Sequence, residues 1–353
     1  MRVTAACIFL FALLVVSSPG QDNSAASVAS LRQRAESGDA RAQFELGRAY
    51  EDGKGVAQDD TRAAEWFRKA ADQGNAQAQN SLGVMYALGR GVSRDREEAI
   101  RWYKKAAKQG QAEAFYNVGI AYYNGEGVAE DLQAAYAWMF VAKSTGDAQA
   151  AEALARMAGE LKTQLVYTKF KLAEMYEKGD EIPRDIDKAV SLYQEVASGD
   201  PHSAAAPFKL CQLYVEGKIV AQDYVQGKSW CAQAAKRGSS ASYLVLGRLA
   251  EMGLGGPTDL KAAADWYQNA AIFNLRDGFM FSGELKLKSG SHDDQKSAYY
   301  WFYLAQRVKI PEADAKLQEA ASHLNKKEIA EQQKKANEWL HTPAWEKMKK
   351  LKR

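Results

Sequence analysis

A spacing of 36 residues constrains the fold of this chain more than any other feature of its sequence. Four residue types keep this spacing along the first part of the chain. They are Trp66, Trp102 and Trp138; Tyr50, Tyr86 and Tyr122; Gly53, Gly89 and Gly125; and Val56, Val92 and Val128. A period of this length indicates a stack of repeated supersecondary units. With 27 Gly, only 7 Pro and abundant Ala, the composition favours helices separated by glycine turns over β-structure.

Each unit predicts two helices joined by a glycine turn. Ala42, Leu46 and Tyr50 recur at helical spacing, which predicts a first helix with a narrow apolar face. Gly53 and Gly55 follow this helix, and glycine readily adopts the backbone conformation that ends one. A second helix carries the repeated tryptophan, for which a core position is favoured and sugar stacking is the alternative.

An aspartate recurs where each second helix is expected to begin. The matched residues are Asp59, Asp95, Asp131, Asp185, Asp223 and Asp259. An aspartate carboxylate accepts hydrogen bonds from the free N–H groups of a helix start, so we expect helix caps. Metal or acid chemistry is the alternative, but whole repeats separate these residues, which favours capping.

The spacing also predicts how the chain is organised. Tyr176 follows Tyr122 by 54 residues, which is one period and a half, so a helical segment is inserted between them. We expect three repeats over residues 31–142, an inserted helical segment over 143–168, three further repeats and one degenerate repeat over 169–310, and a capping helix with a basic tail over 311–353. A polar closing helix protects the last open face of a repeat stack.

The pattern A-x3-LG-x2-Y-x2-G-x-GV-x2-D-x3-A-x2-W-x3-A resembles the Sel-1-like repeat, a relative of the tetratricopeptide repeat. Residues 35–70 and 71–106 match almost throughout, and residues 275–305 match poorly. The resemblance implies an all-α, right-handed superhelical solenoid of antiparallel helix pairs. It also implies a scaffold for protein–protein contacts, and it carries over no catalytic residue and no cofactor.

The N-terminus predicts export. Arg2 precedes a run of twelve apolar residues from Ala5 to Val16, and small residues follow at Ser18 and Gly20. This order is typical of a secretory signal peptide over residues 1–20, with an uncleaved anchor as the alternative. The polar residues 21–30 are expected to form a disordered leader. We therefore expect a periplasmic or secreted protein of bacterial type, with no stable membrane insertion after cleavage.

Charge and motifs exclude several function classes. The net charge is only +3, and no basic stripe runs through the body of the chain, so a nucleic-acid partner is not expected. The basic C-terminus predicts a solvated helix end, with contact to an anionic surface as the alternative. The histidines, none of which lies in a zinc or protease motif, are His202, His292, His323 and His341. The sequence thus predicts no enzyme, metal site or cofactor.

Two cysteines remain after the expected signal cleavage. Cys211 stands at the position of Gly47 on a first helix, and Cys231 at that of Phe67 on the following second helix. The small Gly227 lies one turn before Cys231, so the two cysteines face each other at nearly the same height. An intra-repeat disulfide fits an oxidising compartment, and two buried thiols are the alternative.

We expect partner-binding residues at positions of the first helices that differ from one repeat to the next, while the residues of the repeat pattern stay the same. If these helices line the concave face, as the resemblance implies, the candidates are Arg48, Asn80, Tyr116, Asn117 and Tyr123. Aromatic and amide groups suit peptide backbones and interface anchors. A packing role is the alternative for Tyr116.

Three hypotheses for function follow from these features. The leading one is an exported scaffold that binds a protein or peptide partner through its concave face. The alternative is a factor associated with peptidoglycan or another saccharide, possessing weak hydrolytic activity in one version. A third is secretion to act on a host or neighbouring cell.

Overall fold

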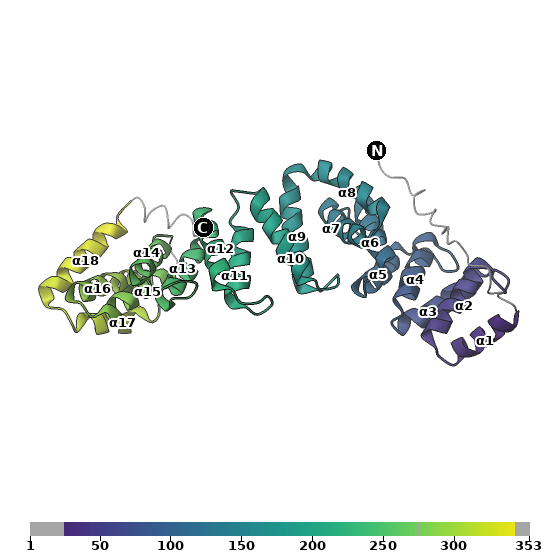
Figure 1. Cartoon of the computed structure of the whole chain (residues 1–353), viewed down its shortest axis with the longest axis horizontal. Helices are drawn as coiled ribbons and strands as arrows, with labels where there is room; N and C mark the ends of the chain where they lie inside the picture. The colour runs from purple at the N-terminus through teal and green to yellow at the C-terminus, as the bar shows by residue number, and fades with distance from the viewer. Residues whose placement is uncertain (1–24, 274–275, 343–353) are drawn as a thin grey trace. The chain divides into compact units, whose positions relative to one another are not determined.

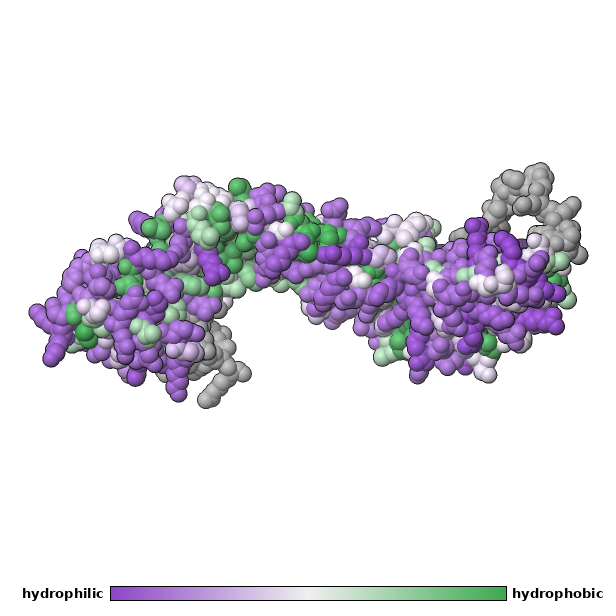
Figure 2. Space-filling view, turned by 90° about the horizontal axis from the view of Figure 1, so that it is seen from below, coloured by the Kyte–Doolittle hydropathy of each residue, from purple (hydrophilic) through white to green (hydrophobic). Residues whose placement is uncertain are grey.

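The computed structural model describes residues 25–273 and 276–342, and every regular element within them is helical. The expected signal peptide, the first four residues of the expected leader and most of the basic tail lie outside these residues. The chain forms two compact units, with the boundary between Leu192 and Tyr193 inside one helix. Along the described segments, no helix is long and apolar enough to cross a membrane. Hydrophilic residues cover most of the face drawn in Figure 2.

Unit 1 is a succession of helices that pair in antiparallel hairpins (Figure 1). Its helices are α1 (Ala25–Glu36), α2 (Ala40–Asp52), α3 (Asp60–Asp72), α4 (Ala76–Leu88), α5 (Arg96–Lys108), α6 (Ala112–Asn124), α7 (Leu132–Ser144), α8 (Ala148–Leu161), the 3-10 helix η2 (Lys162–Gln164) and α9 (Leu165–Lys178). The boundary between the units divides α10 (Ile186–Gly199).

Unit 2 continues the same alternation. Its remaining helices are α11 (Ala205–Glu216), α12 (Tyr224–Lys236), α13 (Ser240–Met252), α14 (Leu260–Ile272), α15 (Arg276–Ser289), α16 (His292–Arg307), α17 (Ala313–Ala321) and α18 (Lys326–Leu340). Within each unit, a helix contacts mainly the helices before and after it in the chain. This nearest-neighbour arrangement is the all-α solenoid of helix pairs that the sequence predicts.

The glycine turns hold neighbouring repeats together. Gly91 lies against the first turn of α3, and a Cβ atom at this position would stand 2.0 Å from the carbonyl oxygen of Asp60. Gly127 has the same relation to α5, where a Cβ atom would stand 2.1 Å from the carbonyl oxygen of Arg96. The second glycine of the repeated turn therefore allows the loop of one repeat to pack on the second helix of the preceding repeat.

Buried glutamines connect each of the first two first helices to the helix before it and to the end of the second helix after it. The side-chain nitrogen of Gln43 donates to the carbonyl oxygen of Ala35 at 3.0 Å, and Gln73 donates to the side-chain oxygen of Gln43 at 2.7 Å. One period later, Gln109 donates to Gln79 at the same distance, 2.7 Å. These hydrogen bonds satisfy amide groups that would otherwise be costly to bury, so they fix the register between repeats.

Helix α1 corrects the expected disordered leader, because residues 25–30 are helical. Although the leader is mostly polar, α1 has an apolar face, because Val28 and Ala35 are buried in the same core as α2. Arg32 donates to the hydroxyl of Tyr50 at 2.9 Å, and Lys104 donates to that of Tyr122 at 2.8 Å across the same 18 residues. Helix α1 thus occupies the place of a second helix in front of the first full repeat.

The segment inserted after the third repeat contains α8 and η2. Helix α8 begins at Ala148, one period after Ala112, so it stands where the first helix of another repeat would begin. No glycine turn and no second helix follow, and η2 leads directly into α9. Residues 143–168 therefore contain one unpaired first helix.

The C-terminal segment corrects the expectation of a single capping helix. Two helices stand there, α17 and α18, with a break at residues 322–325. Asn325 accepts hydrogen bonds at the start of α18, and Glu328 accepts one from the backbone of Asn325 in return. This capping box starts a new helix, and the buried Ala336 of α18 joins a core formed with α15 and α16.

Candidate functional site

The six predicted aspartates stand at starts of second helices. Asp59, Asp95, Asp131, Asp223 and Asp259 are N-caps, and each accepts a backbone N–H of the first turn at 2.8 to 3.0 Å. Asp185 accepts a hydrogen bond from the backbone N–H of Lys188 at 3.0 Å, and this bond lowers the pKa of the Asp185 carboxyl. The described part of the chain contains no group of three or more metal-ligating side chains that could hold an ion.

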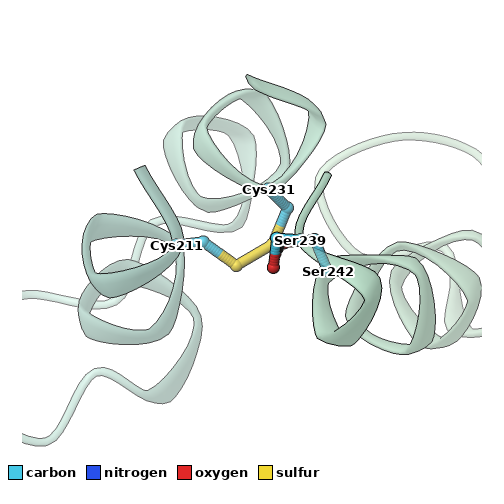
Figure 3. Close-up of a disulfide and its surroundings, with 4 residues drawn as sticks. All are labelled: Cys211, Cys231, Ser239 and Ser242. Carbon is cyan, nitrogen blue, oxygen red and sulfur yellow. Dashed lines mark hydrogen bonds between the residues drawn. A yellow bond between two sulfur atoms is a disulfide. The ribbon is translucent and has the colours of Figure 1, made fainter. Parts of the chain in front are cut away.

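Cys211 and Cys231 are joined by a disulfide in unit 2, with their Cα atoms 4.9 Å apart. Both side chains are fully buried, one on α11 and one on α12. Figure 3 shows Ser239 and Ser242, from the start of α13, beside the bridge. Ser242 donates to the hydroxyl of Ser239 at 2.9 Å.

The repeated tryptophans of the first three units belong to the core or are covered. Trp138 and Trp102 are buried, and Trp66 packs against the core of the first repeats. The ammonium of Lys69 lies 3.9 Å from the centre of the Trp66 ring. Trp102 and Trp138 are therefore core residues, and Trp66 is partly buried with a lysine over its ring.

Two of the predicted binding residues, Arg48 and Tyr123, lie outside the cavity described below. Arg48 is exposed and forms an ion pair with Asp52 on its own helix at 3.7 Å. The hydroxyl of Tyr123 donates to Glu160 of α8 at 3.4 Å. Burial and the Glu160 carboxylate raise the pKa of Tyr123.

A cavity of about 640 Å³ opens in unit 1 between α5, α6 and the start of α8. It is lined by Ala87, Arg96, Ala99, Ile100, Tyr103, Ala112, Glu113, Tyr116, Asn117, Ile120, Ala121, Glu126, Thr145, Gly146, Asp147, Ala148 and Gln149. Its volume lies in the range of pockets that bind small ligands or peptide side chains. An apolar wall with a few polar groups at its ends is the usual composition of such a site.

Two of the predicted binding residues line the cavity, and a third contacts one of them. Tyr116 and Asn117 line it from one face of α6. Asn80 lies on α4, and its side-chain oxygen accepts a hydrogen bond from the Asn117 amide nitrogen at 3.0 Å. This bond uses the amide nitrogen of Asn117, and its side-chain oxygen can still accept a hydrogen bond.

Sequence reasoning missed the ion pair at one end of the cavity, Arg96 with Glu126. In the preceding repeat, Arg90 of the glycine turn binds Asp60 at the start of α3 at 2.9 Å. One period later the two charges are exchanged, because the acidic Glu126 is now in the turn and the basic Arg96 in the helix. The exchange is visible in the sequence once the two positions are known to meet.

The exchanged pair leaves a donor unused. The Nε of Arg90 donates to Asp60 at 3.3 Å, so this guanidinium uses its inner nitrogen. The Nε of Arg96 is buried and has no hydrogen-bond partner among the described residues, and its terminal nitrogen reaches Glu126 only at 3.7 Å. A buried N–H without a partner costs about 1–3 kcal/mol, so the exchanged pair is less well satisfied than the pair of Arg90 with Asp60.

Tyr103 places a second polar group in the same part of the cavity. The side chain is 6% exposed, and burial together with the nearby Glu126 raises the pKa of its phenol, so it stays protonated. Its hydroxyl has no hydrogen-bond partner in the part of the chain that the structure describes. Arg96, Tyr103 and Asn117 together can hold carbonyl oxygens and amide groups, which are the polar groups of a peptide backbone.

The family model described as Sel1 repeat matches the chain seven times. The matched residues are 40–75, 76–111, 112–143, 167–200, 204–239, 240–272 and 283–305, which together exceed half of the chain. No curated protein sequence matches the chain.

Solved structures of similar proteins also contain such repeats. A protective antigen with an SLR fold from uropathogenic Escherichia coli strains is 26% identical over 93% of this chain and 74% of its own, with a TM-score of 0.43. A Sel1 repeat protein from Oxalobacter formigenes is 25% identical over 71% of this chain and 97% of its own, with a TM-score of 0.31. These TM-scores are low, so the family assignment rests on the seven matched repeats.

Proposed function

We propose that this chain, which belongs to the Sel1 repeat family, is an exported scaffold that binds a peptide segment of a partner protein in the cavity along α6. Repeats of this family generally mediate protein–protein interaction, and the family is generally non-enzymatic. The proposal extends that general role to one place on the chain and to one kind of ligand.

The observation that carries this proposal is the buried Tyr103, which lines the cavity and whose hydroxyl has no hydrogen-bond partner among the described residues. Arg96 lines the cavity beside it, with a side chain that is 40% exposed and a terminal nitrogen that reaches Glu126 only at 3.7 Å. Both groups can donate to a carbonyl oxygen, and a peptide backbone presents one at every residue. The amide of Asn117 adds a further contact in the same cavity, where an extended chain would lie along α6.

Peptide selection tests the proposal directly. Random heptapeptides displayed on phage are selected on the full chain, and the affinities of the selected peptides are measured by fluorescence anisotropy. Asn117→Ala and Tyr116→Ala are expected to weaken binding by about 5- to 30-fold, equivalent to about 1–2 kcal/mol. Tyr167→Ala is the matched control, because this tyrosine on α9 is 54% exposed and lies outside the cavity.

Peptides that bind the cavity variants as tightly as they bind the wild type would contradict the proposed site. So would a selection that yields no peptide at all. Either result would leave the general scaffold role of the repeats without a place in this cavity.

Export is tested separately from binding. Residues 1–353 are expressed in a Gram-negative host without an added N-terminal tag, and the N-terminus of the recovered protein is sequenced. We expect Gln21 as the first residue in the periplasmic or secreted fraction, because cleavage is predicted after Gly20. An intact Met1 in the cytoplasmic fraction would contradict export.

A further inference from the structure

We propose that the cavity prefers a peptide carrying an apolar residue and a cationic residue two to four positions apart. This inference rests on the proposed peptide-binding function and names the chemistry of the ligand. It follows from the way in which charge and apolar surface are distributed along the cavity.

The two ends of the cavity differ in charge. At the end nearest the C-terminus of α6, Arg96 and Glu126 pair with each other and leave little net charge. At the other end, Glu113 in the first turn of α6 and Asp147 before α8 both line the cavity. Neither carboxylate has an ion-pair partner among residues 25–273 and 276–342. This end of the cavity is therefore acidic.

Hydrogen bonds do not neutralise these two carboxylates. Asp147 caps α8 by accepting the N–H of Ala150 at 2.9 Å, and Glu113 accepts a hydrogen bond from the side chain of Gln111. Both donors are neutral, so the charges remain. Two like charges facing one cavity attract a cation.

The apolar part of the cavity lies toward its other end. Ile120 and Ala121 from α6 face the cavity together with Ile100 and Ala99 from α5. Removing an aliphatic side chain from water against such a wall contributes about 1.5–3 kcal/mol. An apolar side chain of the ligand is thus expected there, next to the donors of Arg96 and Tyr103.

The length of α6 sets the spacing between the two ligand groups. Glu113 and Ile120 are seven residues apart on the helix, which corresponds to roughly 10 Å at about 1.5 Å per residue. An extended peptide advances about 3.3 Å per residue, so this distance spans roughly three ligand residues. The favoured ligand therefore places Lys or Arg about three positions from its apolar residue.

A carboxylate ligand is disfavoured by the same groups. An acidic peptide would find one donor-rich position near Arg96, but that side chain is already shared with Glu126. Glu113 and Asp147 would repel a second negative charge at the other end. A cationic ligand meets both carboxylates without competing for Arg96.

The test uses three labelled hexapeptides and the full chain. The first is acetyl-Ala-Leu-Ala-Ala-Lys-Ala-amide, and the others carry Gln or Glu in place of Lys. A second set has the reversed order, because the structure does not fix the direction of the ligand. In one of the two orders, the Lys peptide is expected to bind about 3- to 10-fold more tightly than the Gln peptide, and the Glu peptide most weakly.

Isosteric variants separate charge from shape. In the double variant Glu113→Gln and Asp147→Asn, the preference for Lys over Gln is expected to fall to about one, while asparagine still caps α8. The matched control is Asp39→Asn with Glu152→Gln, which removes one N-cap charge from α2 and one exposed charge from α8, both outside the cavity lining. This control is expected to keep the preference of the wild type.

The outcomes distinguish this inference from the proposed function. Equal binding of the Lys, Gln and Glu peptides, still weakened by Asn117→Ala, would overturn the cationic preference and leave the peptide site standing. A Lys preference that survives in the double variant would also overturn it. Failure of all six hexapeptides to bind, together with selected heptapeptides that ignore Asn117→Ala, would overturn both proposals.

Discussion

Because Gly91 packs closely against α3, we predict that Gly91→Ala destabilises the repeat stack more than the same substitution at a turn glycine without neighbours. Gly91 and Gly74 both have positive φ, at 67° and 91°, so alanine at either position carries a backbone penalty of about 1 kcal/mol. A Cβ atom at Gly74 meets nothing within 4 Å, whereas one at Gly91 stands 2.0 Å from the carbonyl oxygen of Asp60. Comparing Gly91→Ala with Gly74→Ala therefore separates the energetic cost of lost packing from the cost of the backbone conformation.

The extra cost at Gly91 can be worked out from what the loop would lose. If the loop that contains Gly91 moves away from α3, the hydrogen bonds from Arg90 to Asp60 at 2.9 and 3.3 Å break. A partly exposed ion pair of this kind contributes up to about 1 kcal/mol. The same movement separates Val92 from the core of the first repeats, against which it packs. Exposing part of this side chain costs about 1 kcal/mol more. Gly91→Ala should thus cost about 3 kcal/mol and Gly74→Ala about 1 kcal/mol.

Hydrogen exchange measured by mass spectrometry suits this prediction, because a repeat stack can open locally. The difference of about 2 kcal/mol corresponds to roughly thirtyfold faster exchange, in fragments covering α3 and α4, for Gly91→Ala than for Gly74→Ala. Exchange rates that agree within twofold between the two variants would refute the packing of this loop against α3.

Unit 2 provides three further predictions. Replacing Cys211 and Cys231 by alanine should lower the unfolding free energy by roughly 3 kcal/mol, since the bridge closes a loop over a separation of 20 residues. Calorimetry with and without reductant measures this loss. An unfolding midpoint of the wild type that does not change in reductant would contradict a disulfide in solution. Asp223→Ala should cost about 1 kcal/mol through the lost N-cap bond and Asp223→Asn almost nothing, so equal losses in urea denaturation would argue against capping. Hydrogen bonds from Lys286 and neighbouring serines lower the pKa of Asp294 from 3.8 to about 2. Its stabilising contribution is therefore complete above about pH 4 and is lost as the pH falls toward 2, so Asp294→Asn should melt below the wild type at pH 7 and together with it at pH 2; a gap that persists at pH 2 would contradict this assignment.

The sequence predicted the repeats because their signals are local and periodic. Asp59 and Gly53 mark the ends of adjacent helices through their own chemistry, and the period reports the same geometry several times over. The first helix was missed because a single polar segment shows little periodicity of its own. Arg32 lies 36 residues before Arg68, and that spacing is the signal that would have found it.

The cavity itself could be predicted only in part. Tyr116 and Asn117 were found because their positions vary between repeats while the frame does not. Arg96, Tyr103 and Glu126 were missed because their roles depend on contacts between elements 20 to 30 residues apart. The cavity is formed by side chains of α5, α6 and the start of α8, and tertiary packing of this kind leaves no local pattern.

Methyl NMR of the full chain, labelled at the δ1 position of isoleucine, tests the central claim of peptide binding along α6 most directly. Ile100 and Ile120 line the cavity, whereas Ile310 and Ile329 belong to cores of unit 2. Titration with acetyl-Ala-Leu-Ala-Ala-Lys-Ala-amide and its reversed form should shift the methyl signals of Ile100 and Ile120 and leave those of Ile310 and Ile329 in place. Signals of Ile100 and Ile120 that stay unchanged at saturating concentrations of both peptides, or shifts confined to unit 2, would contradict the account.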